Sequence, residues 1–434
     1  MALGGGTFTA QNKPLPGTYI NFVSVKAAGN SLSGRGVATM PLFLDWGPEG
    51  VFKVTQDEFL KNSRQIFGYD YTSEKLKNLR ELFLHITTLY GYNLQGGGGK
   101  ATSDNATARY SGLRGNDLKY VIAINPDNTS MFDVTLYLGT VKVDMQTVAK
   151  AEELKDNDYV TWKTGVALEE TAGKTLAGGT NAEVTGDSYQ AYLDAIESYS
   201  FNVMGIAATD ETTKKMVASF TKRMRDDVGV KFQTVMYHYE GDYEGIINVE
   251  NKVKDDGAEE ASLVYWVTGA EAGCAVEDSL MNSLYNGEYT VDVAYTQSGL
   301  KAALDAGKLI FHNVAGDVRV LRDINSLVTF ADDKGEIFQD NKTVRVCDQI
   351  GNDIAALFNT KYMGKIPNDD AGRVSLWNDV VDLHNSLERL RAIENFSSEN
   401  ISVAQGESKN AVVITDAITV TGTMEQLYMT VRVA

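Results

Sequence analysis

The strongest constraint in the sequence is a change of hydrophobic period that repeats between residues 188 and 312. Stretches with apolar residues three and four positions apart, typical of helices, alternate there with short apolar runs typical of strands. The helical stretches are Ser188–Ser198, Glu211–Val228, Glu259–Ala272 and Leu300–Ala306, and the strand-like runs are Phe201–Ala207, Lys231–Met236, Ile246–Val249 and Leu309–His312. This alternation predicts an α/β layer built on a largely parallel sheet.

A different pattern fills residues 120–163, where short runs alternate apolar and polar residues. The turn signals Asn125-Pro126-Asp127-Asn128 and Gly139-Thr140 separate these runs, which predicts a small all-β domain. The glycine run Gly96–Gly99 precedes this block. It marks a domain boundary, because consecutive residues without a Cβ lose much entropy when they are ordered inside an element.

The regions outside these blocks carry their own elements. Thr18–Val25 predicts a strand, and Glu74–Tyr90 predicts a helix that Gly91 ends. Near the other end, apolar faces predict two helices, one carrying Cys347, Ile350, Ile354 and Leu357 and the other Leu376, Val380, Leu383, Leu387 and Leu390. Ala411–Ile414 and Glu425–Val433 are predicted strands, and Gln405–Asn410 is predicted to be a flexible connection.

Composition narrows the function classes. The 434 residues carry a formal charge of −18, which repels phosphate backbones and anionic lipids, so neither a nucleic-acid partner nor membrane insertion is expected. Two cysteines, Cys274 and Cys347, are too few for a disulfide framework and indicate synthesis in a reducing cytoplasm. The first ten residues lack the basic and apolar regions of a secretory signal, and no later stretch is apolar enough to span a membrane.

The residues that resemble cofactor-binding or metal-binding motifs do not have the spacing that these motifs require. Ala172-Gly173-Lys174-Thr175 resembles the end of a phosphate-binding loop, but the first glycine of that motif would have to stand where Leu168 is. None of the four histidines has a second His or Cys at metal-ligand spacing. These histidines are His85, His238, His312 and His384. We therefore expect no cofactor and no metal.

A serine hydrolase is the enzymatic alternative. Asp210, His238 and Ser298 follow the chain order of the catalytic triad in subtilisin-type hydrolases. Order alone is weak evidence in a chain with so many Asp and Ser residues, and no nucleophile-elbow glycines surround Ser298. Capping and turn roles are the simpler interpretation of Asp210 and Ser298, so no catalytic residue is predicted.

The predicted strands at the two ends of the chain suggest assembly instead. A strand near a terminus can leave its own domain, and its backbone donors and acceptors then need the sheet edge of another subunit. Each subunit would offer a donor strand and an acceptor edge, and head-to-tail contacts of this kind generate rings or helices. The alternative is that both strands pack within one monomer.

Several segments resemble contractile tail sheath proteins of Gram-positive phages and phage-tail-like bacteriocins, in the same order along nearly the whole chain. They are Pro16–Phe22, Gly34–Ala38, Leu44–Pro48, Val318–Phe330, Val344–Ile350, Tyr362–Asn368 and Met424–Val431. The all-β block carries the weakest likeness.

The resemblance implies an α/β and α+β multidomain fold. It has a core domain built from both chain ends, a β-sandwich insertion, and a middle domain that is subtilisin-like in fold and is not a protease. The expected division is an N-terminal arm with an exchanged strand (1–25), the N-terminal part of the core (26–93), the sandwich (94–182), the α/β subtilisin-like domain (183–332), the C-terminal part of the core (333–410), and C-terminal strands and arm (411–434).

The resemblance also implies a function and partners. The family assembles as stacked hexameric rings around a tail tube, with a baseplate and a tail terminator, and contracts to drive the tube through a bacterial envelope. The subunit would assemble in the host cytoplasm and remain in the released virion or bacteriocin tail, and a related secretion or injection device is the alternative. The exchanged strands would contain Thr18, Tyr19, Ile20, Asn21, Phe22 and Val23 at one end and Leu427, Tyr428, Met429, Thr430, Val431, Arg432 and Val433 at the other.

Overall fold

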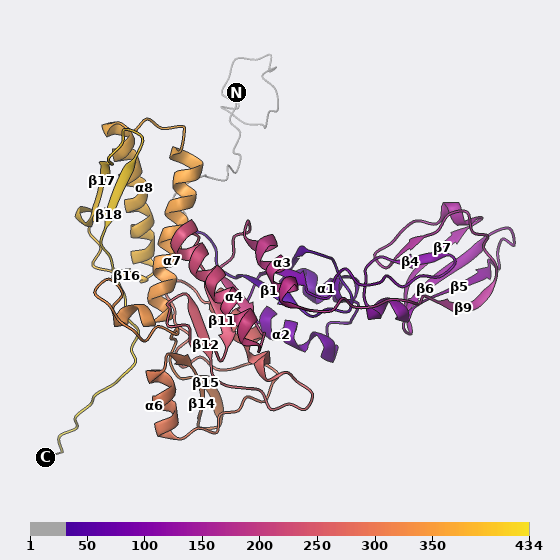
Figure 1. Cartoon of the computed structure of the whole chain (residues 1–434), viewed down its shortest axis with the longest axis horizontal. Helices are drawn as coiled ribbons and strands as arrows, with labels where there is room; N and C mark the ends of the chain where they lie inside the picture. Colours follow the sequence, from indigo (N-terminus) through magenta and orange to yellow (C-terminus); the bar gives the residue numbers. More distant parts are fainter. Residues whose placement is uncertain (1–31, 434) are drawn as a thin grey trace, which may run out of the picture. The chain divides into compact units, whose positions relative to one another are not determined.

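The computed structural model describes residues 32–433, which divide into two compact units (Figure 1). The larger unit contains Ser33–Asn352, Leu387–Asn395 and the residues from Thr419 onward. The smaller unit contains Asp353–Ser386 and Phe396–Ile418. The predicted arm at residues 1–25, with its strand Thr18–Val25, lies outside the described residues.

A seven-stranded sheet with the order β13-β12-β11-β10-β1-β3-β2 organises the larger unit. Neighbouring strands are parallel, except that β2 runs antiparallel to β3. The strands are β1 (Val37–Leu42), β2 (Val51–Thr55), β3 (Thr88–Asn93), β10 (Val203–Ile206), β11 (Gln233–Tyr237), β12 (Ile246–Val249) and β13 (Lys308–Leu309). The largely parallel sheet predicted from residues 188–312 is confirmed.

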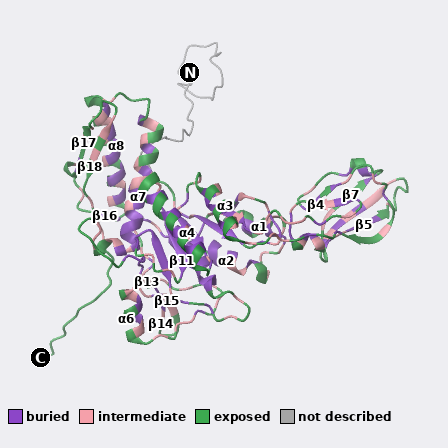
Figure 2. Ribbon diagram, in the orientation of Figure 1, coloured by how far each residue is buried: buried purple, intermediate pink, exposed green. Residues whose placement is uncertain are grey.

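Helices cover both faces of this sheet. On one face, α2 (Lys77–Phe83) and α5 (Leu263–Gly273) share a core with Val203 and Val235. On the other face, α3 (Gly186–Ile196) and α4 (Glu211–Lys222) share a core with Met204 and Met236. Because successive residues of a strand point to opposite faces, β10 and β11 are buried on both sides (Figure 2). The larger unit also contains α1 (Gln56–Phe67), α6 (Gln297–Asp305) and a hairpin of β14 (Phe311–Val314) and β15 (Asp317–Val320).

A buried ionic network holds the first part of α7 (Asn341–Leu357) within the larger unit. Arg345 Nη2 lies 2.7 Å from Glu271 Oε2 and 3.3 Å from Asp323 Oδ2, and Asn341 Nδ2 donates to both carboxyl groups. Burial, and after it the neighbouring Asp323, raises the pKa of Glu271 well above its ordinary range. The raised pKa favours the protonated form of Glu271, whereas the Arg345 charge helps to lower the pKa of Asp323 against the effect of burial.

The helix predicted over Glu74–Tyr90 is too long. A 3₁₀ turn (Glu74–Leu76) leads into α2, which ends at Phe83, and Tyr90 lies in strand β3. Gly91 is inside this strand, where a Cβ would stand 2.8 Å from the ring of Phe52 on β2. The glycine therefore serves the packing of the Phe52 ring and does not end a helix.

The sheet also differs from the expected division of the chain. Residues 26–93 were assigned to a core shared with residues 333–410, but β1, β2 and β3 belong to the same sheet as β10–β13. Ala38 on β1 pairs with Val203 on one side and Leu89 on the other. Hydrophobic period identifies a strand but not its neighbours, and a whole inserted domain separates β1 from β10 in sequence.

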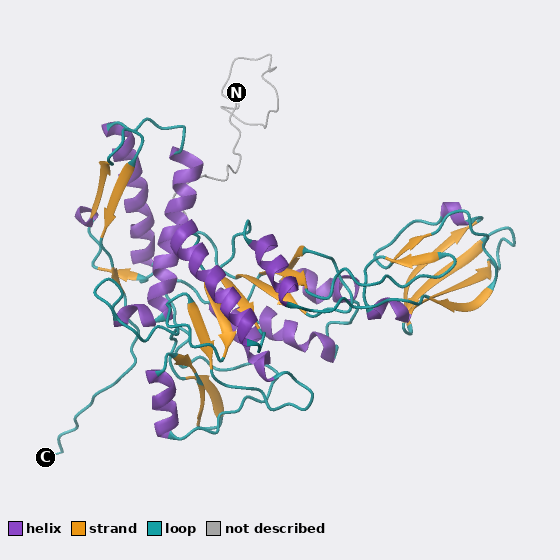
Figure 3. Ribbon diagram, in the orientation of Figure 1, coloured by secondary structure: helices purple, strands orange, loops and turns teal. Residues whose placement is uncertain are grey.

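The inserted domain is a β-sandwich, as predicted for the all-β block (Figure 3). One sheet has the order β7-β6-β5-β9 and the other pairs β4 with β8. The strands are β4 (Ala106–Ala108), β5 (Leu118–Ile124), β6 (Phe132–Leu138), β7 (Val141–Val148), β8 (Val160–Trp162) and β9 (Thr171–Thr175). Tyr120 and Trp162 meet edge to face in its core, with ring centroids 5.8 Å apart.

The glycine run lies where the chain enters the sandwich, directly beside the segment by which it leaves. Thr180 N donates to Gly99 O, and Ala182 N donates to Gln95 O, each over 3.0 Å. A Cβ on Gly98 would stand 1.9 Å from Thr180 O. The run therefore allows two backbone segments to pack closely, which residues with side chains would prevent.

The smaller unit packs a β-hairpin on two helices. The hairpin consists of β17 (Ile401–Gln405) and β18 (Val412–Asp416), and the helices are the end of α7 and most of α8 (Asp370–Arg389). Leu357, Leu376, Val380 and Ile401 form its buried core. The predicted helical faces on α7 and α8 thus supply this core. In the larger unit, β16 (Ile393–Glu394) pairs with β19 (Thr419–Val420).

Candidate assembly interface

Residues 421–433, here called the C-terminal arm, contain no helix or strand (Figure 3). Leu427, Met429, Val431 and Val433 form an apolar row and are 87, 75, 69 and 92% exposed. Tyr428, Thr430 and Arg432 alternate with this row and are exposed as well (Figure 2). A whole row of exposed apolar side chains is unusual in a protein that works as a monomer.

The strand predicted over Glu425–Val433 is therefore not formed by the chain on its own. A strand needs a second strand to pair its N–H and C=O groups, and the described residues place none beside the arm. The alternation that predicted the strand is present, but its backbone partner is missing within one chain.

The root of the arm is fixed to the larger unit. Val420 and Thr419 of β19 pair with Ile393 and Glu394 of β16. Further along, Arg322 Nε and Glu425 Oε2 form an ion pair at 3.1 Å. Beyond Glu425 the Tyr428 hydroxyl donates to Gln426, a contact inside the arm itself. The arm is thus anchored at its start and leaves its apolar row unpacked.

The hairpin β17–β18 is the complementary feature, because it is a sheet of two strands with no third strand on either edge among the described residues. Gly406 N donates to Ala411 O, so this is a hydrogen-bonded pair that closes the turn. Pair geometry alternates along an antiparallel ladder, so the backbone groups of Val412 and Ile414 on β18 point away from β17. They form an edge to which another strand can be added.

The outer edge of β17 is partly occupied. Trp377 Nε1 donates to Ile401 O over 3.0 Å, which uses one of the outward carbonyls of that strand. At the far end of β18, Asp416 Oδ2 lies 2.8 Å from Nε2 of the buried His384. Both contacts hold the hairpin on α8, and they leave the middle of the β18 edge open.

Sequence reasoning found the arm and missed most of this acceptor. Residues Gln405–Asn410 were predicted to be a flexible connection, but they form the tight turn of the hairpin. Strand β17 was not predicted at all. Its signal is the alternation of Ile401 and Val403 with Ser402 and Ala404, ending before Gly406. The N-terminal candidates Thr18–Val23 lie outside the described residues.

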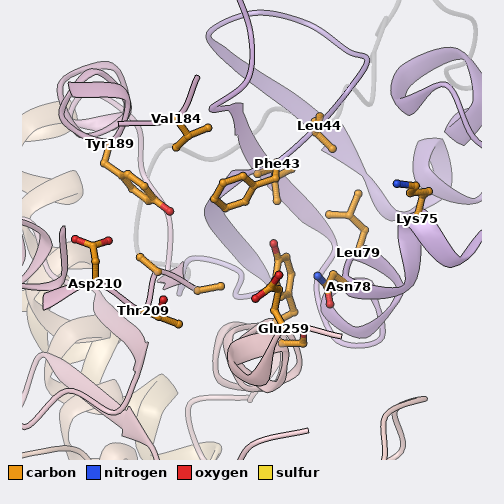
Figure 4. A pocket seen from close by; sticks show the side chains of 15 residues that line it. Phe43, Leu44, Lys75, Asn78, Leu79, Val184, Tyr189, Thr209, Asp210 and Glu259 are labelled. Atoms are coloured by element: carbon orange, nitrogen blue, oxygen red, sulfur yellow. The ribbon is translucent and has the colours of Figure 1, made fainter. Parts of the chain in front are cut away.

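A cavity of about 540 Å³ lies at the carboxyl ends of the parallel strands (Figure 4). The chain leaves the adjacent strands β1 and β10 in opposite directions across the sheet, and open α/β sheets commonly bind ligands at such a point. Figure 4 shows the Tyr189 hydroxyl pointing toward Phe43. Burial, and then the nearby Asp210, raises the pKa of Tyr189 to about 12, so this hydroxyl stays protonated at neutral pH.

This cavity gives no support to the hydrolase alternative. Of the three candidate residues only Asp210 lines it, and Asp210 accepts a hydrogen bond from Thr213 N as the N-cap of α4. His238 Nε2 lies 2.7 Å from Glu250 O, and the Ser298 hydroxyl lies 3.0 Å from Thr296 Oγ1. Within the part of the chain that the structure describes, no hydrogen bond joins any two of the three.

Among residues 32–433, no group of three or more His, Cys, Asp or Glu side chains is placed to hold a metal ion. No helix in this range combines the length and the apolar character needed to cross a membrane. The motif-like residues Ala172–Thr175 lie in β9, at the edge of the sandwich.

Three regions of the chain match families of one kind. Residues 96–181 match the phage tail sheath protein beta-sandwich domain, residues 182–326 the phage tail sheath protein central domain, and residues 333–434 the phage tail sheath C-terminal domain. These regions cover the sandwich, most of the strands and helices that follow it, and the segment with the hairpin and the arm.

Comparisons over the whole chain agree with these family matches. The phage-like element PBSX protein XkdK of Bacillus subtilis (strain 168) is 34% identical over 470 residues, which cover 99% of this chain and 100% of the relative. The crystal structure of the sheath tail protein from Desulfitobacterium hafniense is 35% identical with a TM-score of 0.82, covering 96% of this chain and 100% of that one. The helical sheath of the anti-feeding prophage in its contracted state shares the fold, at a TM-score of 0.55 and 12% identity over 97% of this chain and 99% of that one.

The mixed α/β multidomain fold with a β-sandwich agrees with these matches, and the predicted family is confirmed. The chain belongs to the phage tail sheath protein family, whose members are structural subunits of tails.

Proposed function

We propose that this chain is the repeating subunit of a contractile tail sheath and that neighbouring copies are joined by exchanged terminal strands. One observation carries the proposal: a single chain presents both halves of the joint. The C-terminal arm exposes an alternating apolar row with no strand beside it, and the hairpin β17–β18 exposes an edge with no strand beside it. Copies that pair arm to edge form an open-ended chain of subunits.

Strand exchange of this kind explains how a sheath stays continuous while its subunits turn. Residues Leu427–Val433 of one copy would pair with the hairpin of another, and the N-terminal strand Thr18–Val25 would be the second exchanged segment. Main-chain hydrogen bonds supply affinity, and alternate side chains supply register. The joint would persist through contraction because its bonds lie within the added strand.

The work of contraction would come from contacts outside this joint. Copies would stack as hexameric rings around a tail tube, between a baseplate and a tail terminator. The extended sheath would be metastable, and the shorter state would bury surface that the extended state exposes. The shared fold with the contracted helical sheath of the anti-feeding prophage supports this reading. The middle domain would be subtilisin-like in fold alone.

The proposed setting is a phage or a phage-tail-like bacteriocin. The subunit would assemble in the host cytoplasm and leave with the completed tail, where contraction drives the tube through a bacterial envelope. A related secretion or injection device would use the same subunit and the same joint.

Deleting residues 425–434 tests the proposal. The truncated chain is expected to fold with an unchanged melting temperature, because the apolar row of the arm is exposed, and to remain monomeric when the parent chain forms tubes. Negative-stain electron microscopy and analytical sedimentation at matched concentration measure the difference. If the truncated chain forms normal tubes, the proposal is wrong.

A further inference from the structure

The smaller unit contains a cavity of about 270 Å³ beside the open edge of β18. Its apolar lining includes Phe358, Tyr362, Met363, Ile366, Leu376 and Val412, and the polar residues Asn368, Arg373 and Asn410 line it as well. Met363 is 56% and Ile366 is 41% exposed, so the cavity has an apolar rim open to solvent. Such a rim is costly in water unless another molecule covers it.

The position of the cavity relative to the hairpin indicates what covers it. Val412 of β18 lines the cavity, and among the described residues none from β17 does, so the cavity lies on the β18 side. The side chains of Val412 and Ile414 face the helices, while their backbone groups point outward from the hairpin. A strand added along β18 would therefore place every second side chain on the face that the cavity occupies.

The C-terminal arm has the pattern that this geometry requires. Its apolar row and its polar row alternate, so one row can face the helices while the other faces solvent. Met429 is the second of the four residues in the apolar row, and its unbranched, flexible side chain suits an irregular cavity. Thr430 beside it would point the other way.

We propose that this cavity is a recognition pocket for the apolar row of the C-terminal arm of a second copy, with Met429 as its central occupant. The proposal rests on the strand exchange proposed above and adds to it. Backbone pairing alone would accept almost any extended segment in several registers, whereas a side-chain pocket next to the edge selects the correct segment and fixes its register.

Two neighbouring substitutions on the arm separate pocket binding from backbone pairing. Met429→Asp places a charge in the pocket, whereas Thr430→Asp places the same charge on the solvent side, and neither should affect folding because both side chains are exposed in the monomer. Losing the contacts of a buried methionine side chain lowers the affinity between two copies by about tenfold or more. Met429→Asp should therefore raise the protein concentration needed for tube assembly by about tenfold or more, and Thr430→Asp by less than about threefold.

The outcomes of this comparison are distinct. If both substitutions impair assembly equally, the arm pairs without the pocket, which overturns this proposal and leaves strand exchange standing. If neither has an effect and the chain lacking residues 425–434 also assembles, both proposals fail. The melting temperature of each variant is measured first, to show that the two monomers are equally stable.

Disulfide trapping identifies the occupant. Chains carrying Ile366→Cys are mixed with tagged chains carrying Met429→Cys, assembled and oxidised, and we expect a reducible dimer between the two kinds of chain. Thr430→Cys replaces Met429→Cys in the matched control and should give several-fold less dimer. Trapping within one chain that carries both cysteines, or no trapping above this control, would show that the chain's own arm or another segment fills the pocket and would overturn the proposal.

Discussion

The seven-stranded sheet and the hairpin β17–β18 differ in how far a single chain supplies their neighbouring strands and covers their faces. The sheet takes all its strands from its own chain, and helices cover both of its faces. The hairpin has two strands, rests on helices by one face, and leaves an edge and an apolar cavity open. Such a two-stranded element is marginally stable by itself. The larger unit thus completes its own sheet, whereas the smaller unit leaves open the edge that the proposed joint would use.

Breaking the buried network of the larger unit should give the largest loss of stability. Asp323→Asn removes the charge that balances Arg345, and an unpaired buried charge costs about 3–5 kcal/mol. The free energy of unfolding measured with denaturant should fall by that amount. The matched control is Glu271→Gln, which keeps the shape of the protonated side chain and should cost about 1 kcal/mol or less. Equal losses in the two variants would show that Glu271 carries the charge instead.

A smaller and local effect is expected at the hairpin. Trp377→Phe removes the Nε1 donor to Ile401 O and should cost about 0.5–1.5 kcal/mol. Hydrogen exchange should quicken in β17 and β18 and stay unchanged in the strands of the larger sheet. Faster exchange in β10 and β11 as well would contradict the separation between the two regions.

The same buried network should also give the stability a dependence on pH. Since the pKa of Glu271 is raised in the folded chain, this group should make the parent less stable as pH rises above the ordinary carboxyl range, by at most about 1.4 kcal/mol per pH unit. The Glu271→Gln variant lacks a carboxyl group at this position and therefore releases no proton there. As pH rises from about pH 5 to about pH 8, the melting temperature of the parent should therefore fall relative to that of the variant. Parallel curves for the two proteins would mean that Glu271 is ionised in the fold.

Sequence reasoning predicted the elements whose pattern is long or repeated. The apolar faces of α7 and α8 and the strands β10, β11 and β12 follow directly from hydrophobic period. Strand β3 was lost because Tyr90 continues the spacing of the helix before it, and only its pairing with β1 and β2 reveals the strand. Which strands become neighbours is a tertiary property that period does not encode.

The same limit applies to the assembly site. The alternation from Leu427 to Val433 identified the arm from sequence, because it is a local pattern. The pocket joins the helical turn Phe358–Tyr362 and the loop after it with α8 and Val412, and these segments are brought together only by folding. The edge of β18 is visible only once the register with β17 is known.

The close join at the base of the sandwich bears on how this architecture can change. The chain departs near Gln95 and returns at Ala182, and one hydrogen bond of 3.0 Å links these two points. Because the two points are so close, the larger unit needs little structural adjustment when the sandwich between them is enlarged, exchanged or removed. The sandwich can therefore vary in size or sequence with little effect on the sheet from which it emerges.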